Sequence, residues 1–145
     1  MQEMAARADA VVHFFEHLQR SELSRLGQIY APQAHFRDPF NEVQGLAQIE
    51  AIFQHMYRSL EQPHFIVTER VLQGRQCFLV WDFRFRFQRF SPEQWQTVQG
   101  SSHLRFDDQG LIEYHRDYWD AAQELYEKLP AVGAVMRWLR RRAMR

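Results

Sequence analysis

The sequence predicts an α+β fold in which helices come first and a largely antiparallel sheet follows. Up to about residue 60, apolar residues recur at the spacing of one helix face, and beyond it they alternate with polar residues as in half-buried strands. Aromatic residues form 14% of the chain, so we expect an interior lined by rings. A length of 145 residues suits one domain with one continuous core.

Three helices are predicted in the first part of the chain. The first covers about residues 3–19, and the second begins at Ser21 and ends before Pro32. The apolar side of the second helix consists of Leu23, Leu26 and Tyr30. The third helix begins at Gly45 and ends at Pro63.

Strands are predicted where the hydrophobic period changes to two. A short extended piece at residues 35–39 precedes the third helix. Longer strands are expected at residues 64–72, 76–90, 94–106 and 111–119. Turns rich in glycine, proline and aspartate separate these strands, so we expect an antiparallel meander. Asp120 can cap a closing helix. The apolar face of that helix is expected to consist of Leu125, Tyr126 and Leu129.

The balance of charge argues against a nucleic-acid partner. The chain has 18 basic and 18 acidic residues and a formal net charge of +0, so it lacks a basic excess that would attract phosphates. Cys77 is the single cysteine, which excludes an internal disulfide and suits a reducing compartment. No apolar run reaches the ~18 residues of a membrane span, and the first residues lack the apolar core of a signal peptide. We therefore expect a cytoplasmic protein.

The last segment, residues 130–145, carries five arginines and no acidic residue. We expect it to form a basic helix that begins near Pro130 and extends the main domain, residues 1–129. The apolar residues expected to pack on the body or on a neighbouring subunit are Val132, Val135, Met136 and Leu139. Contact of this helix with an anionic membrane ranks second, because its apolar stripe is short and arginines near a helix C-terminus already interact favourably with the dipole.

Two stretches of the sequence resemble the SnoaL-like branch of the nuclear transport factor 2-like superfamily. Residues 30–40 lead through a short strand to Asp38-Pro39, with Gly45 and the third helix following, and residues 103–120 match the last two strands and their turn. The resemblance implies a cone-shaped fold, in which N-terminal helices pack in the concave face of a curved sheet and enclose a pocket for a small apolar molecule. It also implies frequent dimerisation through the outer face of the sheet.

The resemblance assigns roles to three positions. Asp38 falls where ketosteroid isomerase has its proton-transferring carboxylate, while Phe15 and Ser102 fall where that enzyme has two strong hydrogen-bond donors. The absence of both donors argues against ketosteroid isomerisation itself. Because Phe36 and Phe40 flank Asp38, its carboxylate suits a general base. The alternative is an aspartate that serves only the turn, since Asp-Pro is a common turn opener.

The last strand offers a second set of candidate residues. His115, Asp117 and Trp119 alternate, so their side chains point to one face, which the resemblance makes the cavity face. SnoaL-like enzymes use a cavity His and Asp in acid–base chemistry, and the resemblance gives this pair that role. Alternatively, Asp117 pairs with Arg116 or Arg105 and is solvated. Because both arginines alternate onto the other face, an Asp-Arg-Asp array like that of limonene epoxide hydrolases is not expected.

The main hypothesis is a protein that binds a small apolar ligand and transfers a proton, with Asp38 as the base and His115 and Asp117 positioning or protonating the ligand. The residues expected to contact the ligand are Phe15, Tyr57, Trp81, Ser102 and Trp119. The alternative is a non-catalytic ligand-binding or assembly domain of the same fold.

No cofactor or metal ion is expected, because the sequence lacks a glycine-rich nucleotide motif. The His13–His17 segment has the spacing of an inverted zinc-protease motif, but a solvated helix face explains it better. We further expect a homodimer formed through the outer face of the sheet. The residues that alternate onto that face are Arg84, Arg86, His103, Arg105 and Arg116.

Overall fold

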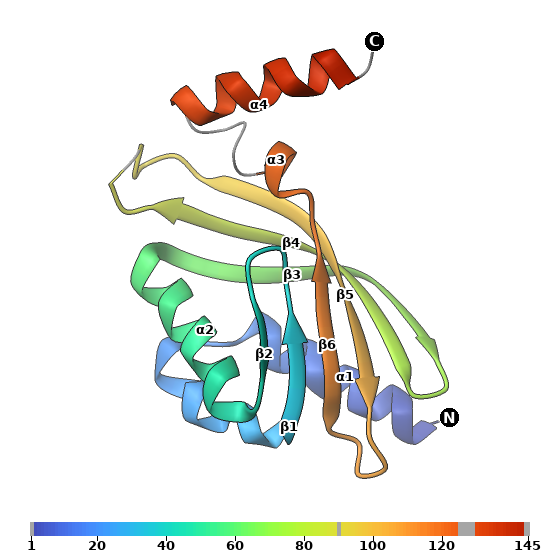
Figure 1. Cartoon of the computed structure of the whole chain (residues 1–145). Helices are drawn as coiled ribbons and strands as arrows, with labels where there is room; N and C mark the ends of the chain where they lie inside the picture. Colours follow the sequence, from blue (N-terminus) through green and yellow to red (C-terminus); the bar gives the residue numbers. More distant parts are fainter. Residues whose placement is uncertain (1, 90, 125–129, 144–145) are drawn as a thin grey trace.

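A computed structural model describes residues 2–89, 91–124 and 130–143. In chain order its elements are helix α1 (Gln2–Glu16), the 3₁₀ helix η1 (Arg20–Gln28), strands β1 (Tyr30–Arg37) and β2 (Glu42–Gln44), helix α2 (Leu46–Ser59), strands β3 (Leu60–Gln73), β4 (Gln76–Phe87), β5 (Gln96–Phe106) and β6 (Ile112–Tyr118), and helices α3 (Ala121–Glu124) and α4 (Pro130–Ala143). The predicted α+β order is confirmed (Figure 1). Asp120 Oδ1 accepts the backbone N–H of Gln123 at 3.1 Å and caps α3 as predicted. The expected apolar face of the closing helix, Leu125, Tyr126 and Leu129, lies outside the described residues.

The six strands form one curved sheet in the order β2-β1-β6-β5-β4-β3 (Figure 1). The expected four-stranded meander corresponds to β3, β4, β5 and β6, whose neighbouring pairs are antiparallel. β1 extends this meander by running parallel to β6, and β2 pairs with β1 in the antiparallel sense. The parallel pair therefore places the first strand of the chain beside the last one. In the described part of the chain, no helix is long and apolar enough to cross a membrane.

Two prolines lie inside strands, although helix ends were predicted at both. Pro32 lies in β1 between Tyr30 and His35, where the pairing with β6 shifts register. Pro63 lies in β3 at a second register shift, in the pairing with β4, and α2 already ends at Ser59. Proline lacks the N–H needed for a regular strand pair and is tolerated at such irregularities. The second predicted helix is therefore shorter than expected, and Tyr30 belongs to a strand.

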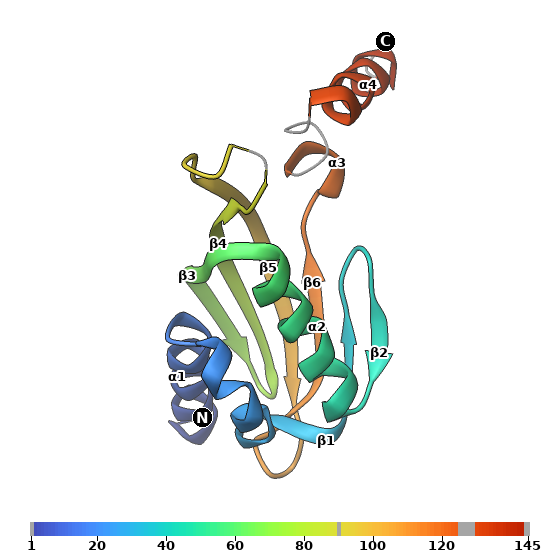
Figure 2. The same ribbon diagram turned by 90° about the vertical axis from the view of Figure 1, so that its left-hand side faces the viewer.

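Helices α1 and α2 lie on the same side of the sheet and cover its inner face (Figure 2). Glu16, at the end of α1, accepts a hydrogen bond from the backbone N–H of Val67 in β3 at 2.9 Å. This bond fixes the end of α1 against the edge of the sheet. Buried residues of the core between helices and sheet include Ala8, Val11, Ile49, Phe53, Leu104 and Phe106.

Alternation along β4 separates an inner face from an outer one, as predicted. Leu79 and Trp81 are buried, whereas Phe78 and Val80 are 42% and 39% exposed. Gly100 of β5 lies opposite Trp81, and a Cβ atom at this glycine would lie 2.5 Å from the indole ring. Glycine at this position therefore allows the indole to lie directly against the neighbouring strand.

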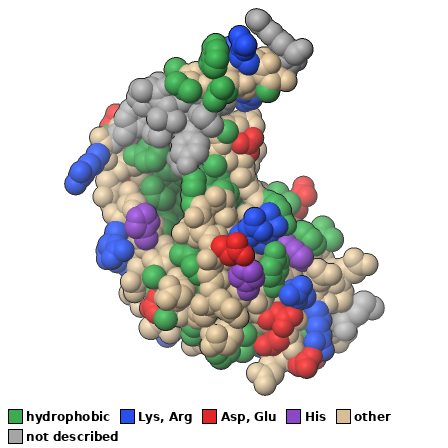
Figure 3. Space-filling model, viewed as in Figure 1, with side chains coloured by type: hydrophobic (Ala, Val, Ile, Leu, Met, Phe, Trp, Pro, Cys, Tyr) green, Lys and Arg blue, Asp and Glu red, His purple; other side chains and the backbone are tan. Residues whose placement is uncertain are grey.

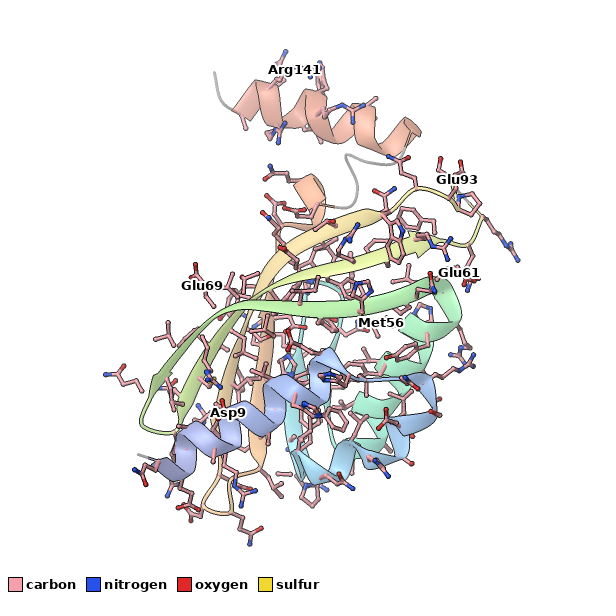
Figure 4. The ribbon with its side chains drawn as sticks, turned by 180° about the vertical axis from the view of Figure 1, so that it is seen from behind. Asp9, Met56, Glu61, Glu69, Glu93 and Arg141 are labelled. Carbon is pink, nitrogen blue, oxygen red and sulfur yellow. The ribbon has the colours of Figure 1, made fainter. Side chains whose placement is uncertain are left out.

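The C-terminal segment forms a helix that begins at Pro130, as predicted, and α4 stands apart from the sheet (Figures 1 and 2). Val135 and Leu139 are 55% and 48% exposed, so the prediction that they pack on the body of the same chain is wrong. Their packing on a second subunit stays a prediction. Arg141 points away from the rest of the chain (Figure 4). The side chains of Val132 and Met136 lie outside the description.

Candidate functional site

A cavity of about 340 Å³ lies between α1, α2 and the inner face of the sheet. Small-molecule sites usually measure about 300–1,000 Å³, so this volume suits a small ligand. Its wall is mostly aromatic, and the rings include Phe15, Phe36, Phe53, Phe65, Trp81 and Trp119. Figure 3 shows hydrophobic side chains gathered in a hollow of the surface. In Figure 4, Met56, which also belongs to the wall, lies between α2 and the sheet.

Five polar side chains form a continuous hydrogen-bonded chain at this wall. Trp81 Nε1 donates to Ser102 Oγ at 2.9 Å, and Ser102 Oγ donates to Asp117 Oδ1 at 2.5 Å. His115 Nε2 lies 2.6 Å from the same Oδ1, and His115 Nδ1 lies 2.6 Å from the hydroxyl oxygen of Tyr30. The five residues come from the adjacent strands β4, β5, β6 and β1, and Ser102 is directly opposite Asp117 in the β5–β6 pair. The register of the sheet therefore aligns all five of these hydrogen-bonded side chains.

The donors and acceptors among these five hydrogen-bonded side chains have one consistent arrangement. An indole N–H can only donate, so Ser102 accepts from Trp81 and gives its own hydrogen to Asp117. Burial and the nearby charge of Asp117 raise the pKa of Tyr30 well above its ordinary value, so the hydroxyl keeps its hydrogen and donates to His115 Nδ1. Nε2 then carries the hydrogen of the ring and donates it to Asp117. This pattern of hydrogen bonds favours the tautomer of His115 with its hydrogen on Nε2.

Asp117 lines the cavity, and its two carboxylate oxygens differ in their hydrogen bonds. Oδ1 accepts two hydrogen bonds, whereas Oδ2 has no hydrogen-bond partner among the described residues. The side chain of Asp117 is 16% exposed. Rings surround its partner, since the centroid of His115 lies 4.8 Å from that of Phe36 and 5.9 Å from that of Phe15. An oxygen held in this way can accept a proton from a ligand or pair with a cation.

The two arginines considered as partners of Asp117 lie on the outer face instead. Arg105 pairs with Glu113 at 2.9 Å, and Arg116 lies over the ring of Tyr118 at 4.4 Å. The alternative prediction, in which Asp117 pairs with either arginine, is therefore wrong. The partners of Asp117 are His115 and Ser102.

A match to a protein-family model identifies the family to which this sequence belongs. Residues 11–115 match the SnoaL-like domain. The chain belongs to the SnoaL-like family. The family predicted from residues 30–40 and 103–120 is thereby confirmed, whereas no curated protein matches the sequence.

Solved structures similar to this SnoaL-like domain share its fold at low sequence identity. A protein with a ketosteroid isomerase-like fold from Catenulispora acidiphila, in complex with trimethylamine, is 16% identical with a TM-score of 0.70, and the match covers 82% of this chain and 88% of that one. An NTF2-like protein from Burkholderia pseudomallei is 15% identical with a TM-score of 0.71, over 85% of this chain and 95% of that one. An LEH-like epoxide hydrolase from M. tuberculosis is 11% identical with a TM-score of 0.65, over 85% of this chain and 86% of that one. These similarities establish the fold alone. The chemistry of the site has to be argued from the residues of this chain.

In this SnoaL-like domain Asp38 also lines the cavity, but a turn holds its carboxylate. Oδ1 accepts the backbone N–H groups of Phe40 at 2.8 Å and of Asn41 at 2.6 Å. The side-chain amide of Asn41 lies 3.1 Å from each carboxylate oxygen. The turn considered as the alternative for Asp38 is therefore present. Asp38 shares the cavity with His115 and Asp117, but protein donors already engage both of its oxygens.

All but one of the other residues predicted to contact the ligand line the cavity. Phe15, Trp81, Ser102 and Trp119 line the cavity of the SnoaL-like domain, as do His115 and Asp117. Tyr57 does not, because its hydroxyl donates to the backbone oxygen of Leu18 at 3.1 Å and its ring borders a separate surface groove. Tyr57 therefore lies outside this cavity wall, and its contact with a ligand stays a prediction.

Tyr30 supports His115 from behind the cavity wall and was not among the site residues predicted from the sequence. A helix was expected at this position, so its side chain was assigned to general core packing. Tyr30, Ala34 and Phe36 are all buried and share the period of two of β1. That alternation is the signal that could have placed Tyr30 on the inner face of a strand.

Replacing Tyr57 by phenylalanine is expected to lower the free energy of unfolding by ~1 kcal/mol, because the hydrogen bond to Leu18 is lost. Burial, together with the charge of Glu22, raises the pKa of Tyr57 to about 12. Between its ordinary value of ~10 and about 12, the unfolded chain loses the phenolic proton more readily than the folded chain, so wild-type stability falls as pH rises. The stability difference between wild type and Tyr57→Phe should therefore shrink in this window. Urea denaturation near neutral pH and at about pH 11 measures the stability difference between the two proteins. A difference that is the same at both pH values would contradict the raised pKa of Tyr57.

Proposed function

We propose that the cavity binds a small, largely apolar molecule and that Asp117 transfers a proton to or from it. The observation that carries this proposal is the unequal use of the two Asp117 oxygens. Oδ1 is held by His115 and Ser102, and Oδ2 is left without a partner among the described residues, in a cavity walled by rings. A general base needs such an oxygen within hydrogen-bond reach of the ligand.

The residues around Asp117 have distinct roles in this proposal. The N–H of His115 and the hydroxyl of Ser102 stabilise the carboxylate and fix its orientation. Tyr30 and Trp81 are positioning residues, because each acts through its hydrogen bond to His115 or Ser102. Proton transfer would then take place at Oδ2.

Asp117 replaces Asp38 as the proposed base because of their hydrogen bonds. Asp38 accepts two backbone N–H groups and the Asn41 amide, which use the carboxylate to build the turn. Its place on the cavity wall suits contact with the ligand rather than proton transfer.

Binding without turnover is the second candidate function. Phe15 lacks a polar group, and Ser102 already bonds Trp81 and Asp117, so neither offers the ligand a strong free donor. The fold accommodates both uses, since its neighbours include an LEH-like epoxide hydrolase and a protein in complex with trimethylamine. Both candidate functions place the ligand in this cavity, and only the first includes turnover of the ligand.

A thermal-shift screen of small hydrophobic metabolites tests ligand binding in the cavity. The matched variant is Val98→Phe, since Val98 is buried and lines the cavity, and a larger side chain there fills part of the space. Compounds that raise the melting temperature of the wild type should not raise that of the variant. Equal shifts in the two proteins would place binding elsewhere and contradict the proposal. A cooperative melting transition of the variant serves as the folding control.

We also propose that two copies of the chain associate through the outer face of the sheet. Phe78 stacks on His103 with centroids 4.4 Å apart, His103 contacts Tyr114 at 5.4 Å, and Tyr114 contacts His35 at 5.7 Å. This row of rings crosses β4, β5, β6 and β1, and Phe78 is 42% exposed. A contiguous row of partly exposed rings on a sheet face favours a protein partner over water, and a second copy offers the same surface.

Light scattering of the wild type at micromolar concentrations is expected to show a dimer, and Phe78→Glu is expected to give monomers. The new charges would have to be removed from water in the contact, which is unfavourable. Gln54→Glu introduces the same charge on the exposed side of α2 and should leave the dimer intact. A wild type that is monomeric throughout this range would contradict the proposed association.

A further inference from the structure

The cavity wall carries two carboxylates, and its basic side chains are the imidazoles of His55 and His115. Among the lining residues that the structure describes, Asp38 and Asp117 are acidic, and none is a lysine or an arginine. N–H donors surround the carboxylate of Asp38, but Oδ2 of Asp117 has no such partner in the described part of the chain. A largely buried carboxylate without a positive partner is unfavourable. This oxygen therefore favours a ligand that brings a positive charge.

His115 does not supply that charge, because of its bond to Tyr30. Tyr30 is fully buried, and in the described structure its hydroxyl bonds only to His115 Nδ1. A second ring hydrogen at Nδ1 would force the hydroxyl to accept, and its own hydrogen would then point into a core without an acceptor. The bond to Tyr30 therefore favours a His115 ring whose hydrogen lies on Nε2 and is donated to Asp117 Oδ1.

Aromatic rings complete a site suited to a cation. On the cavity wall, the ring of Phe65 lies 5.4 Å from that of Trp81 and 4.6 Å from that of Phe83. Near Asp117 along the chain, Trp119 meets Phe40 edge to face at 5.5 Å. The faces of such rings attract ammonium groups, while their apolar area packs against methyl or ring carbons. Carboxylate and rings therefore recognise different parts of one apolar amine.

We propose that the ligand of this cavity is an apolar amine with a positive charge, either a protonated tertiary amine or a quaternary ammonium, and that its charged group lies beside Asp117 Oδ2. This inference rests on the proposed function, since it takes the cavity as the ligand site and adds the charge of the ligand. A protonated tertiary amine also fits the acid–base role, because its N–H would donate to the oxygen assigned to proton transfer.

Isothermal titration of the full-length chain with two ligands of the same shape tests this inference. Phenyltrimethylammonium and tert-butylbenzene differ only in a charged nitrogen in place of a carbon. We expect the wild type to bind the ammonium at least ~10-fold more tightly. Asp117→Asn, which keeps the size of the side chain, should bring the two affinities close together and leave that for tert-butylbenzene nearly unchanged. Asp82→Asn makes the same change in β4, where residue 82 alternates onto the outer face, and should retain the preference.

The outcomes separate this inference from the proposed function. Equal affinities in the wild type, or tighter binding of tert-butylbenzene, would overturn the inference and leave an apolar ligand site in place. A preference for the ammonium that survives Asp117→Asn would also overturn it, since the charge beside the ligand would then lie elsewhere. If neither ligand binds the wild type, both the inference and the proposed ligand site fail. Unchanged binding of tert-butylbenzene to Asp117→Asn shows that the variant folds.

Discussion

The variant Asp117→Asn is expected to transfer protons at least ~100-fold more slowly than the wild type, which is the usual scale for loss of a general base. An asparagine keeps the shape of the side chain and one oxygen that can accept from Ser102, but it has no carboxylate to receive the proton. The rate is measured by NMR as deuterium uptake from heavy water into a cavity ligand that has an acidic C–H group. Affinity for neutral ligands should change little, so the effect appears in the rate of exchange.

Asp38→Asn is the matched comparison for this experiment. Asparagine is also favoured before proline in turns, and it can accept a backbone N–H through its side-chain oxygen. We expect its exchange rate to stay within ~10-fold of the wild type. If Asp38→Asn removes exchange and Asp117→Asn does not, the base is Asp38. If both variants exchange at the wild-type rate, the cavity binds without catalysis.

Trp81→Ala is expected to lower the free energy of unfolding by ~3–5 kcal/mol, the range for truncating a large buried aromatic residue. Trp81 is 5% exposed, packs its ring against Phe65 and lies directly against Gly100. Truncation removes these contacts and enlarges the existing cavity. It also removes the donor to Ser102, so the hydroxyl that holds Asp117 is no longer fixed from behind.

Urea denaturation followed by circular dichroism measures this effect, and two variants separate its causes. Trp81→Phe keeps an aromatic ring and loses the N–H, so we expect a cost of ~1–3 kcal/mol. Trp95→Ala makes the same truncation at a residue that is 40% exposed and should cost ~1 kcal/mol. A loss for Trp81→Ala as small as that for Trp95→Ala would contradict the central place of Trp81 in the wall.

The sequence predicted those parts of the fold that depend on local periodicity. The alternation of Trp81, Phe83 and Phe85 with polar residues correctly predicted the inner face of β4. The same alternation put His115 and Asp117 on one common face, and the resemblance to SnoaL-like proteins made this the cavity face. These predictions hold because a strand assigns every second side chain to one face, whatever its neighbours are.

Features that depend on distant pairing were not accessible in the same way. Tyr30 reaches His115 because β1 runs parallel to β6, a pairing between the first and last strands that leaves no local signal. Pro32 and Pro63 were expected to end helices, but register shifts in the sheet accommodate both. Tyr57 follows the apolar spacing of α2, yet its hydroxyl donates to the backbone oxygen of Leu18 and does not reach the cavity. Each outcome was decided by packing between segments rather than by residue type.

The proposed base and the proposed cation site both depend on the position of the hydrogen on the His115 ring. Nitrogen-15 NMR of the ligand-free protein near neutral pH distinguishes the two neutral tautomers from the doubly protonated ring. We expect a neutral ring with its hydrogen on Nε2, and we expect Tyr30→Phe to disturb this pattern by removing the donor to Nδ1. A hydrogen on Nδ1, or a doubly protonated ring in the wild type, would contradict the arrangement that leaves Asp117 Oδ2 free for a ligand.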